Sequence, residues 1–332
     1  MVDYTNVISV GCGLIFLIIV GFVTVKFRII KPSALAPINS FLFKPCFTWM
    51  IAKNVMYQNL KELDFKPFGA VALSAIAAQI LLTFTFLFKN DNKLAFYLST
   101  MLPSTYVNYV IIGVPIFDAI WPGQDLQILT VITLCNDIVT APVYMFLAGV
   151  NSYYEKNREH VKKGEPKDKF SFLILLTLIL NIIKSPIIIG YIIGFIWAGI
   201  GIPKCVFVDT MINTSSQCIL ALSCFCVGSF LAQHEIVSCP WYQFLICGLS
   251  RHVVMPLLAG LFSSAFGASA KQSRQTIIIS TLPTAVGSFL LSSNSNVGTG
   301  PSSTMIFWTN VFFIPAIIVW FVALDKLNIF IE

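Results

Sequence analysis

The chain has 332 residues, of which 57% are hydrophobic and only 11% are charged, and its mean hydropathy is +0.83. This composition excludes a soluble globular protein, because so few polar residues could not cover a water-exposed surface. The net charge of +6 is small, and no basic patch with interleaved aromatic residues is present, so nothing favours nucleic-acid binding. We expect an integral, multi-pass membrane protein.

Ten apolar stretches, each of about twenty residues or more, follow one another along the chain, and each is long enough to cross a bilayer as a helix. They are 5–25, 33–52, 68–88, 95–121, 127–149, 171–200, 206–232, 241–266, 274–297 and 303–324. The sixth is too long for one straight span and contains Ser185-Pro186, so we expect a linking helix over 171–183 and a span that begins near Ser185. The sequence therefore predicts an all-α fold with ten transmembrane helices.

The fourth and ninth stretches carry prolines and small polar residues at matching places. The two segments are Leu102-Pro103-Ser104-Thr105-Tyr106-Val107-Asn108 and Leu282-Pro283-Thr284-Ala285-Val286-Gly287-Ser288. The two prolines are 180 positions apart, and Asn108 and Ser288 have the same separation. A proline removes a backbone donor and clashes with the carbonyl one turn earlier, so such segments survive in a membrane only where they are buried or line a polar cavity.

This repetition divides the chain into two halves of five helices each, with the broken helix fourth in each half. We expect the first repeat over residues 1–150, a short linker over 151–169 and the second repeat over 170–332. Interrupted helices at corresponding places of two inverted repeats are the usual sign of a transporter's binding site. We therefore expect helices four and nine to be broken and to cross at such a site.

The linker is the one clearly hydrophilic segment, and it holds six Lys and Arg residues. Loops on the linker side of the predicted membrane carry 11 Lys and Arg residues, against 7 in the loops on the other side. The positive-inside rule therefore predicts a cytosolic linker and non-cytosolic termini. The count does not distinguish the plasma membrane from an endomembrane.

Charged residues inside spans are costly, so each is a candidate functional residue. Asp137 lies mid-span beside Asn136, and Arg251 in the eighth stretch is its natural partner or a counter-charge for an anion. We expect Asn136, Asp137 and Arg251 to serve ion coupling or gating, the alternative being a purely structural acid. Lys44 is a candidate substrate contact or an interfacial cation, and Gln79 a candidate interhelical hydrogen bond.

The N-termini of broken helices present unpaired N–H groups and partial positive charge, so a site between two such breaks favours an anion. The expected substrate contacts are Pro103, Ser104, Thr105, Asn108, Pro283, Thr284 and Ser288. No Ser-His-Asp or Cys-His set, phosphate-binding loop or metal-ligand cluster is present, and the nine cysteines show no CxxC pairing. We expect neither an enzyme nor a cofactor nor a metal site.

The segment from Leu102 to Pro115 resembles the fourth-span signature of the auxin efflux carrier family, the plant PIN-formed proteins and their microbial relatives. The segment from Leu282 to Phe289 resembles that family's ninth-span signature, closest to its bacterial members. The resemblance implies an inverted-repeat fold related to sodium/proton antiporters, with a transport domain that moves against a scaffold, and export or exchange of small carboxylates such as auxin. Ser104 and Thr284 stand where the plant carriers have Asn and Gln.

We therefore predict a secondary transporter of small organic anions, auxin-like carboxylates or related metabolites, that works by alternating access with a rocking or elevator motion. One alternative is a sodium- or proton-coupled carrier centred on Asp137. Another is a non-transporting membrane sensor on the same fold, which would be expected to carry a long tail, whereas this sequence ends seven residues after Asp325. The expected partners are the anion, a proton or sodium ion, the lipid bilayer and a second copy of the chain in a homodimer.

Overall fold

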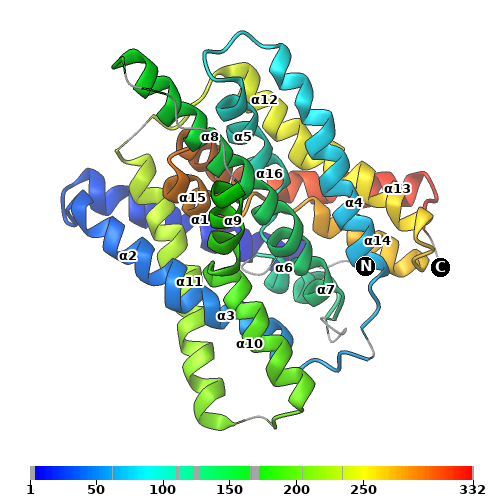
Figure 1. Ribbon diagram of the computed structural model, residues 1–332. Helices are drawn as coiled ribbons and strands as arrows, with labels where there is room; N and C mark the ends of the chain where they lie inside the picture. The colour runs from blue at the N-terminus through cyan, green and yellow to red at the C-terminus, as the bar shows by residue number, and fades with distance from the viewer. Residues whose placement is uncertain are drawn as a thin grey trace.

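The protein is described by a computed structural model that covers residues 4–61, 63–109, 112–122, 127–164, 166, 172–203, 205–233 and 235–330. Within these residues the fold is all-helical and contains no strand (Figure 1). Five helices in the described part are long and apolar enough to cross a membrane, namely Lys66–Leu87, Ile128–Lys162, Val206–Leu231, Trp241–Ala265 and Thr299–Lys326. The prediction of an all-α membrane protein is confirmed.

The described residues of the N-terminal half form eight α-helices. They are α1 (Tyr4–Lys26), α2 (Leu35–Phe41), α3 (Phe47–Met56), α4 (Lys66–Leu81), α5 (Lys93–Thr105), α6 (Gly113–Ile120), α7 (Gln127–Cys135) and α8 (Ala141–Lys162). The π-helical segments Leu42–Cys46 and Asn136–Thr140 join α2 to α3 and α7 to α8, and a 3₁₀ segment, Leu82–Leu87, extends α4. The linker begins as helix, because α8 continues to Lys162.

The part of the C-terminal half that the structure describes also forms eight α-helices. They are α9 (Phe172–Ile183), α10 (Pro186–Ile200), α11 (Val206–Leu231), α12 (Trp241–Leu249), α13 (Met255–Ala265), α14 (Ala270–Ser280), α15 (Val286–Ser295) and α16 (Thr299–Lys326). A third π-helical segment, Ser250–Val254, joins α12 to α13. The sixth stretch divides as predicted, since the Ser185 hydroxyl caps α10 by accepting from the Ile188 N–H at 3.3 Å.

Helices from the two halves pack against one another in pairs. The closest pairs are α1 with α11, α3 with α10 and α4 with α13 (Figure 1). Between α1 and α11, a side chain at Gly21 would overlap the backbone of Phe225, and one at Gly228 would overlap the backbone of Ile18. Glycine at both positions therefore allows the two backbones to touch, which is how helices reach dense packing where no water is present to drive association.

The two broken helices meet in the middle of the molecule. The chain leaves helix after Thr105 and re-enters it at Gly113, and in the other half it leaves after Ser280 and re-enters at Val286. Between the breaks, Val107 and Thr284 form an isolated antiparallel bridge. The pairing satisfies backbone groups that would otherwise be orphaned in the membrane interior.

The bridge consists of two backbone hydrogen bonds. The Asn108 N–H donates to the Pro283 carbonyl at 2.9 Å, and the Ala285 N–H donates to the Tyr106 carbonyl at 2.9 Å. The expectation that both helices break at their prolines holds for Pro283, but it is wrong for Pro103, which lies inside α5. Pro103 lacks a backbone donor, but the last turn of α5 still closes, because the Tyr106 N–H donates to the Leu102 carbonyl at 2.9 Å.

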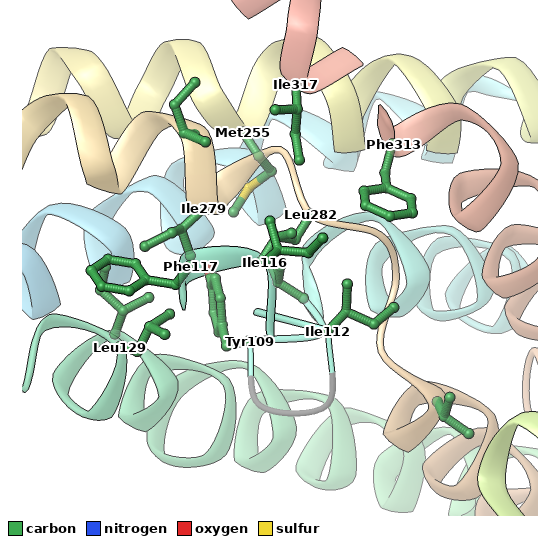
Figure 2. Packing of buried hydrophobic residues seen from close by; sticks show 14 of the residues in the cluster. Tyr109, Ile112, Ile116, Phe117, Leu129, Met255, Ile279, Leu282, Phe313 and Ile317 are labelled. Carbon is green, nitrogen blue, oxygen red and sulfur yellow. The ribbon is translucent and has the colours of Figure 1, made fainter. Parts of the chain in front are cut away.

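Apolar side chains seal one side of the breaks. Figure 2 shows Leu282 of the second break near Ile112 and Ile116, which lie at the end of the first break and in α6. Met255 of α13 and Phe313 of α16 belong to the same buried cluster. Protein rather than lipid therefore covers the unwound backbone on this side.

Candidate functional site

A small cavity lies where the two breaks meet, and we call it the break cavity. Its volume is about 30 Å³. It is lined by Phe47, Met50, Ile51, Tyr106, Val107, Asn108, Tyr109, Thr133, Asn136, Asp137, Ala285, Val286 and Gly287. A water needs about 10–15 Å³ of such space, so in this conformation the cavity has room for about two waters or a bare cation but not for an organic anion.

One wall of the break cavity is rich in hydrogen-bond donors. The side-chain amide nitrogen of Asn108 is buried and has no hydrogen-bond partner among the described residues. Val286 and Gly287 open helix α15, and the first N–H groups of a helix have no acceptor within it. This helix start also carries the positive end of the helix dipole. The wall therefore favours a negatively charged group.

Asp137, which also lines the break cavity, accepts two tyrosine hydroxyl groups. The Tyr106 hydroxyl donates to Oδ1 at 2.8 Å, and the Tyr191 hydroxyl donates to Oδ2 at 2.8 Å. Asp137 is only 3% exposed. Because Tyr106 belongs to the first break and Tyr191 to α10, the carboxyl group connects the break to a helix outside it.

Asn136 fixes the backbone of the first break. Its Nδ2 donates to the Val107 carbonyl at 2.5 Å, and its Oδ1 accepts from the Val107 N–H at 3.2 Å. The side-chain amide thus pairs with both polar groups of one residue, as a neighbouring strand would. Asn136 therefore holds Val107 in position next to Asp137.

Arg251 lies at the C-terminal ends of α5 and α14, directly before the two breaks. Its Nη1 donates to the Ser104 carbonyl at 3.0 Å, and its Nη2 donates to the Ser280 carbonyl at 2.6 Å. These carbonyls belong to the last turns of α5 and α14, which carry the negative ends of the helix dipoles. The expected pairing with Asp137 is wrong, because no ion pair joins the two in the described part of the chain. The guanidinium instead neutralises two helix C-termini.

The hydroxyl groups expected to contact substrate donate to nearby backbone carbonyls. The bonds are Ser104 to Thr100 at 2.7 Å, Thr105 to Met101 at 2.8 Å, Thr284 to Pro103 at 2.7 Å and Ser288 to Ala285 at 2.8 Å. Among the described residues that line the break cavity is Asn108, but none of these four hydroxyl-bearing residues and neither proline. These residues therefore shape the breaks, and the structure brings only Asn108 of the expected contacts to the cavity.

Two further candidates lie elsewhere. Lys44 is exposed in the π-helical segment between α2 and α3 and lines a separate, larger cavity. Gln79 is buried in α4, and its backbone carbonyl accepts the Tyr97 hydroxyl at 3.1 Å. Its side-chain nitrogen has no partner among the described residues, so the expected interhelical bond of this side chain is not formed there.

The tyrosines on Asp137 were not predicted from the sequence. Tyr106 and Tyr191 each lie in an apolar run, where tyrosine resembles a core residue. The one available signal is chemical. A tyrosine hydroxyl buried in a membrane span needs a hydrogen-bond acceptor, and an acid in a span such as Asp137 needs donors. The distance in sequence gives no indication of that pairing.

Comparisons with known proteins identify the family of this chain. A family model described as "Membrane transport protein" matches residues 10–321. The chain is 21% identical over 365 residues to auxin efflux carrier component 8 of Arabidopsis thaliana, and the match covers 97% of this chain and 98% of that protein. The range matched by the family model includes the two breaks and the residues of the break cavity. The chain therefore belongs to the auxin efflux carrier family of membrane transport proteins.

Proposed function

We propose that the protein is a secondary transporter of small organic anions, auxin-like carboxylates or related metabolites, and that the anionic group binds at the break cavity. The unpartnered Asn108 amide beside the first N–H groups of α15 is the observation that carries this proposal. Amide and backbone donors at a helix N-terminus bind carboxylates without a full cationic side chain. The relative from Arabidopsis, an auxin efflux carrier component by name, supports the same class of substrate.

The proposed architecture is ten spans in two inverted repeats, with the fourth and ninth crossing. The pattern of helix contacts supports it. Exchanging the two halves turns the contact of α1 with α11, spans one and seven, into that of α10 with α3, spans six and two. The same exchange turns the contact of α5 with α8 into that of α14 with α16. Such reciprocity is expected of two repeats related by a two-fold axis in the membrane plane.

Transport by this cavity requires a change of conformation. The break cavity of about 30 Å³ is too small for a carboxylate with an organic group attached. Its wall combines the breaks with Phe47, Met50 and Ile51 of α3. We propose that the helices around the breaks rock or slide against a scaffold of α1, α3, α10 and α11, and that this motion enlarges the cavity and exposes it to alternate sides.

The orientation proposed for this motion follows from the charge of the loops. The excess of Lys and Arg on the side of residues 151–169 favours a cytosolic linker and non-cytosolic termini. The homodimeric state and the identity of the membrane stay predictions.

We expect Asn108→Ala to weaken binding of carboxylates by about 1–3 kcal/mol, which is about 5- to 150-fold in Kd, because a buried donor of the site is lost. The measurement is uptake of radiolabelled indole-3-acetate and benzoate into liposomes that contain the purified protein. Ser104→Ala is the matched control, since its hydroxyl already donates to Thr100 and is not in the cavity wall. Failure of the wild-type protein to move any carboxylate, or equal uptake by Asn108→Ala, would overturn the proposal.

A coupled carrier is the second candidate, and the position of Asp137 favours it. A carboxyl group in a cavity of this size can hold a proton or a sodium ion. Binding of that cation would cancel the negative charge that an incoming carboxylate would otherwise meet. Under this proposal the anion and the cation occupy the break cavity together, and Asp137 couples their movement.

A further inference from the structure

A second cavity lies between the linker side of the protein and the break cavity. Its volume is about 550 Å³, within the range of pockets that hold small organic ligands. It is lined by Lys44, Tyr144, Met145, Ala148, Gly149, Ser152, Ile182, Lys184, Ser185, Pro186, Leu291, Asn294, Ser295 and Asn296. These residues come from the segment before α3, from α8, from the junction of α9 with α10, and from the end of α15.

The charged side chains in the described wall of this cavity are all positive. Lys44 and Lys184 both line it, and no Asp or Glu is found among the described residues of its wall. Neither ammonium group forms an ion pair with a carboxylate anywhere in the described part of the chain. Two uncompensated cations in one concave site raise the local concentration of anions.

Neutral groups in the wall complement the two lysines. Ser152, Asn294 and Asn296 supply hydroxyl and amide donors. Helix α10 starts here, with Ser185 as its N-cap, so the positive end of its dipole points to the same space. Apolar residues such as Met145 and Leu291 provide surface for the organic part of a ligand.

Three helical segments line both cavities at different heights. Lys44 precedes Phe47 by about one turn, Tyr144 follows Asp137 by about two turns, and Leu291 follows Gly287 by about one turn. At 1.5 Å per residue these offsets correspond to roughly 5–10 Å along each helix. Since α8 runs from Asp137 towards the linker, the second cavity lies on the linker side of the first.

We propose that this second cavity, the Lys44–Lys184 antechamber, is a separate binding site that captures the carboxylate of a small organic anion on the linker side before the anion moves to the break cavity. This inference rests on the proposed transport of organic anions and adds a residue-level capture site to it. The ammonium groups attract the carboxylate from solution, and the donors at the breaks then receive it once the helices move apart.

A labelling experiment tests binding without requiring transport. The purified protein in non-ionic detergent is treated with an amine-acetylating reagent, and modification of each lysine is followed by mass spectrometry of its peptides. Indole-3-acetate at about ten times its Kd should slow labelling of Lys44 and Lys184 about tenfold, by mass action. The uncharged analogue indole-3-acetamide should not protect them, and Lys53 in α3, which is not in the antechamber wall, should be labelled at the same rate throughout.

A transport experiment tests the role of the same site. Lys44→Gln and Lys184→Gln should each raise the KM for uptake of indole-3-acetate from the linker side about threefold to tenfold, and should raise KM more than they lower kcat. Added salt should weaken uptake by the wild-type protein more than uptake by the double variant, because salt screens the ammonium groups. Lys53→Gln is the control and should behave like the wild type.

The outcomes separate this inference from the proposed function. Protection of both lysines in a protein that transports no carboxylate would support the antechamber and overturn the transport proposal. Transport with an unchanged KM in both lysine variants, or equal protection by indole-3-acetamide, would overturn the antechamber alone. Protection by phosphatidylserine in nanodiscs, with none by indole-3-acetate in detergent, would also overturn it, because the site would then bind a lipid headgroup.

Discussion

Replacing Arg251 by methionine is expected to lower the free energy of unfolding by about 2–4 kcal/mol and to abolish transport. The variant leaves the carbonyls of Ser104 and Ser280 buried without their charged donor, and each unsatisfied group costs about 1–3 kcal/mol, partly offset by removal of a buried charge. It also leaves two negative helix ends facing each other. Thermal unfolding of the purified protein in detergent, together with uptake into liposomes, measures both effects.

Two control variants test whether the loss of stability comes from the two hydrogen bonds of Arg251. Arg251→Lys keeps the charge but cannot reach both carbonyls with a planar fork, so it should recover stability only in part. Arg158→Met removes an exposed arginine, 3.7 Å from Glu155, and should change stability by no more than about 1 kcal/mol. Stability equal to that of the wild type in Arg251→Met would mean that the two helix ends do not depend on the guanidinium.

The second large effect is expected from Asp137→Asn, which should remove any dependence of transport on pH or sodium. The asparagine has nearly the same size, and tyrosine hydroxyls can both donate to its oxygen and accept from its nitrogen, so the fold should stay largely intact. The negative charge that attracts a cation is lost. The measurement is uptake of radiolabelled indole-3-acetate over a range of pH and sodium concentrations.

Tyr191→Phe provides the matched control for Asp137. It keeps the carboxyl group and removes its bond to α10, so ion dependence should remain while the rate of transport changes. Unchanged ion dependence in Asp137→Asn would identify Asp137 as a structural acid, and simple uniport would then be the better account of the mechanism.

The sequence predicted the membrane fold and the position of the second break because both depend on local chemistry. Apolar length alone identifies spans. The division of the sixth stretch follows from Ser185-Pro186, because serine is favoured as an N-cap and proline at the first helical position. The second break lies at Pro283, where a missing donor and a restricted preceding residue act together.

The contacts inside the site could not be predicted, because they depend on groups far apart in the chain. Arg251 donates to carbonyls of α5 and α14. Every residue has a backbone carbonyl, so the sequence does not indicate which carbonyls accept a side-chain donor. The hydroxyl of Ser104 was expected to face a ligand, but a serine in a helix readily bonds the carbonyl one turn earlier. Of the expected substrate contacts, Asn108 is the one that lines the break cavity in the described part of the chain, together with the expected coupling residues Asn136 and Asp137.

The central claim is that a small organic anion binds between the two breaks, and a cryo-electron microscopy structure with saturating indole-3-acetate tests it most directly. Our account predicts an enlarged break cavity with the carboxylate about 2.7–3.2 Å from the Asn108 amide nitrogen and from an N–H group at the start of α15. Density for the anion away from both breaks, with the break cavity still closed around Asp137, would contradict it.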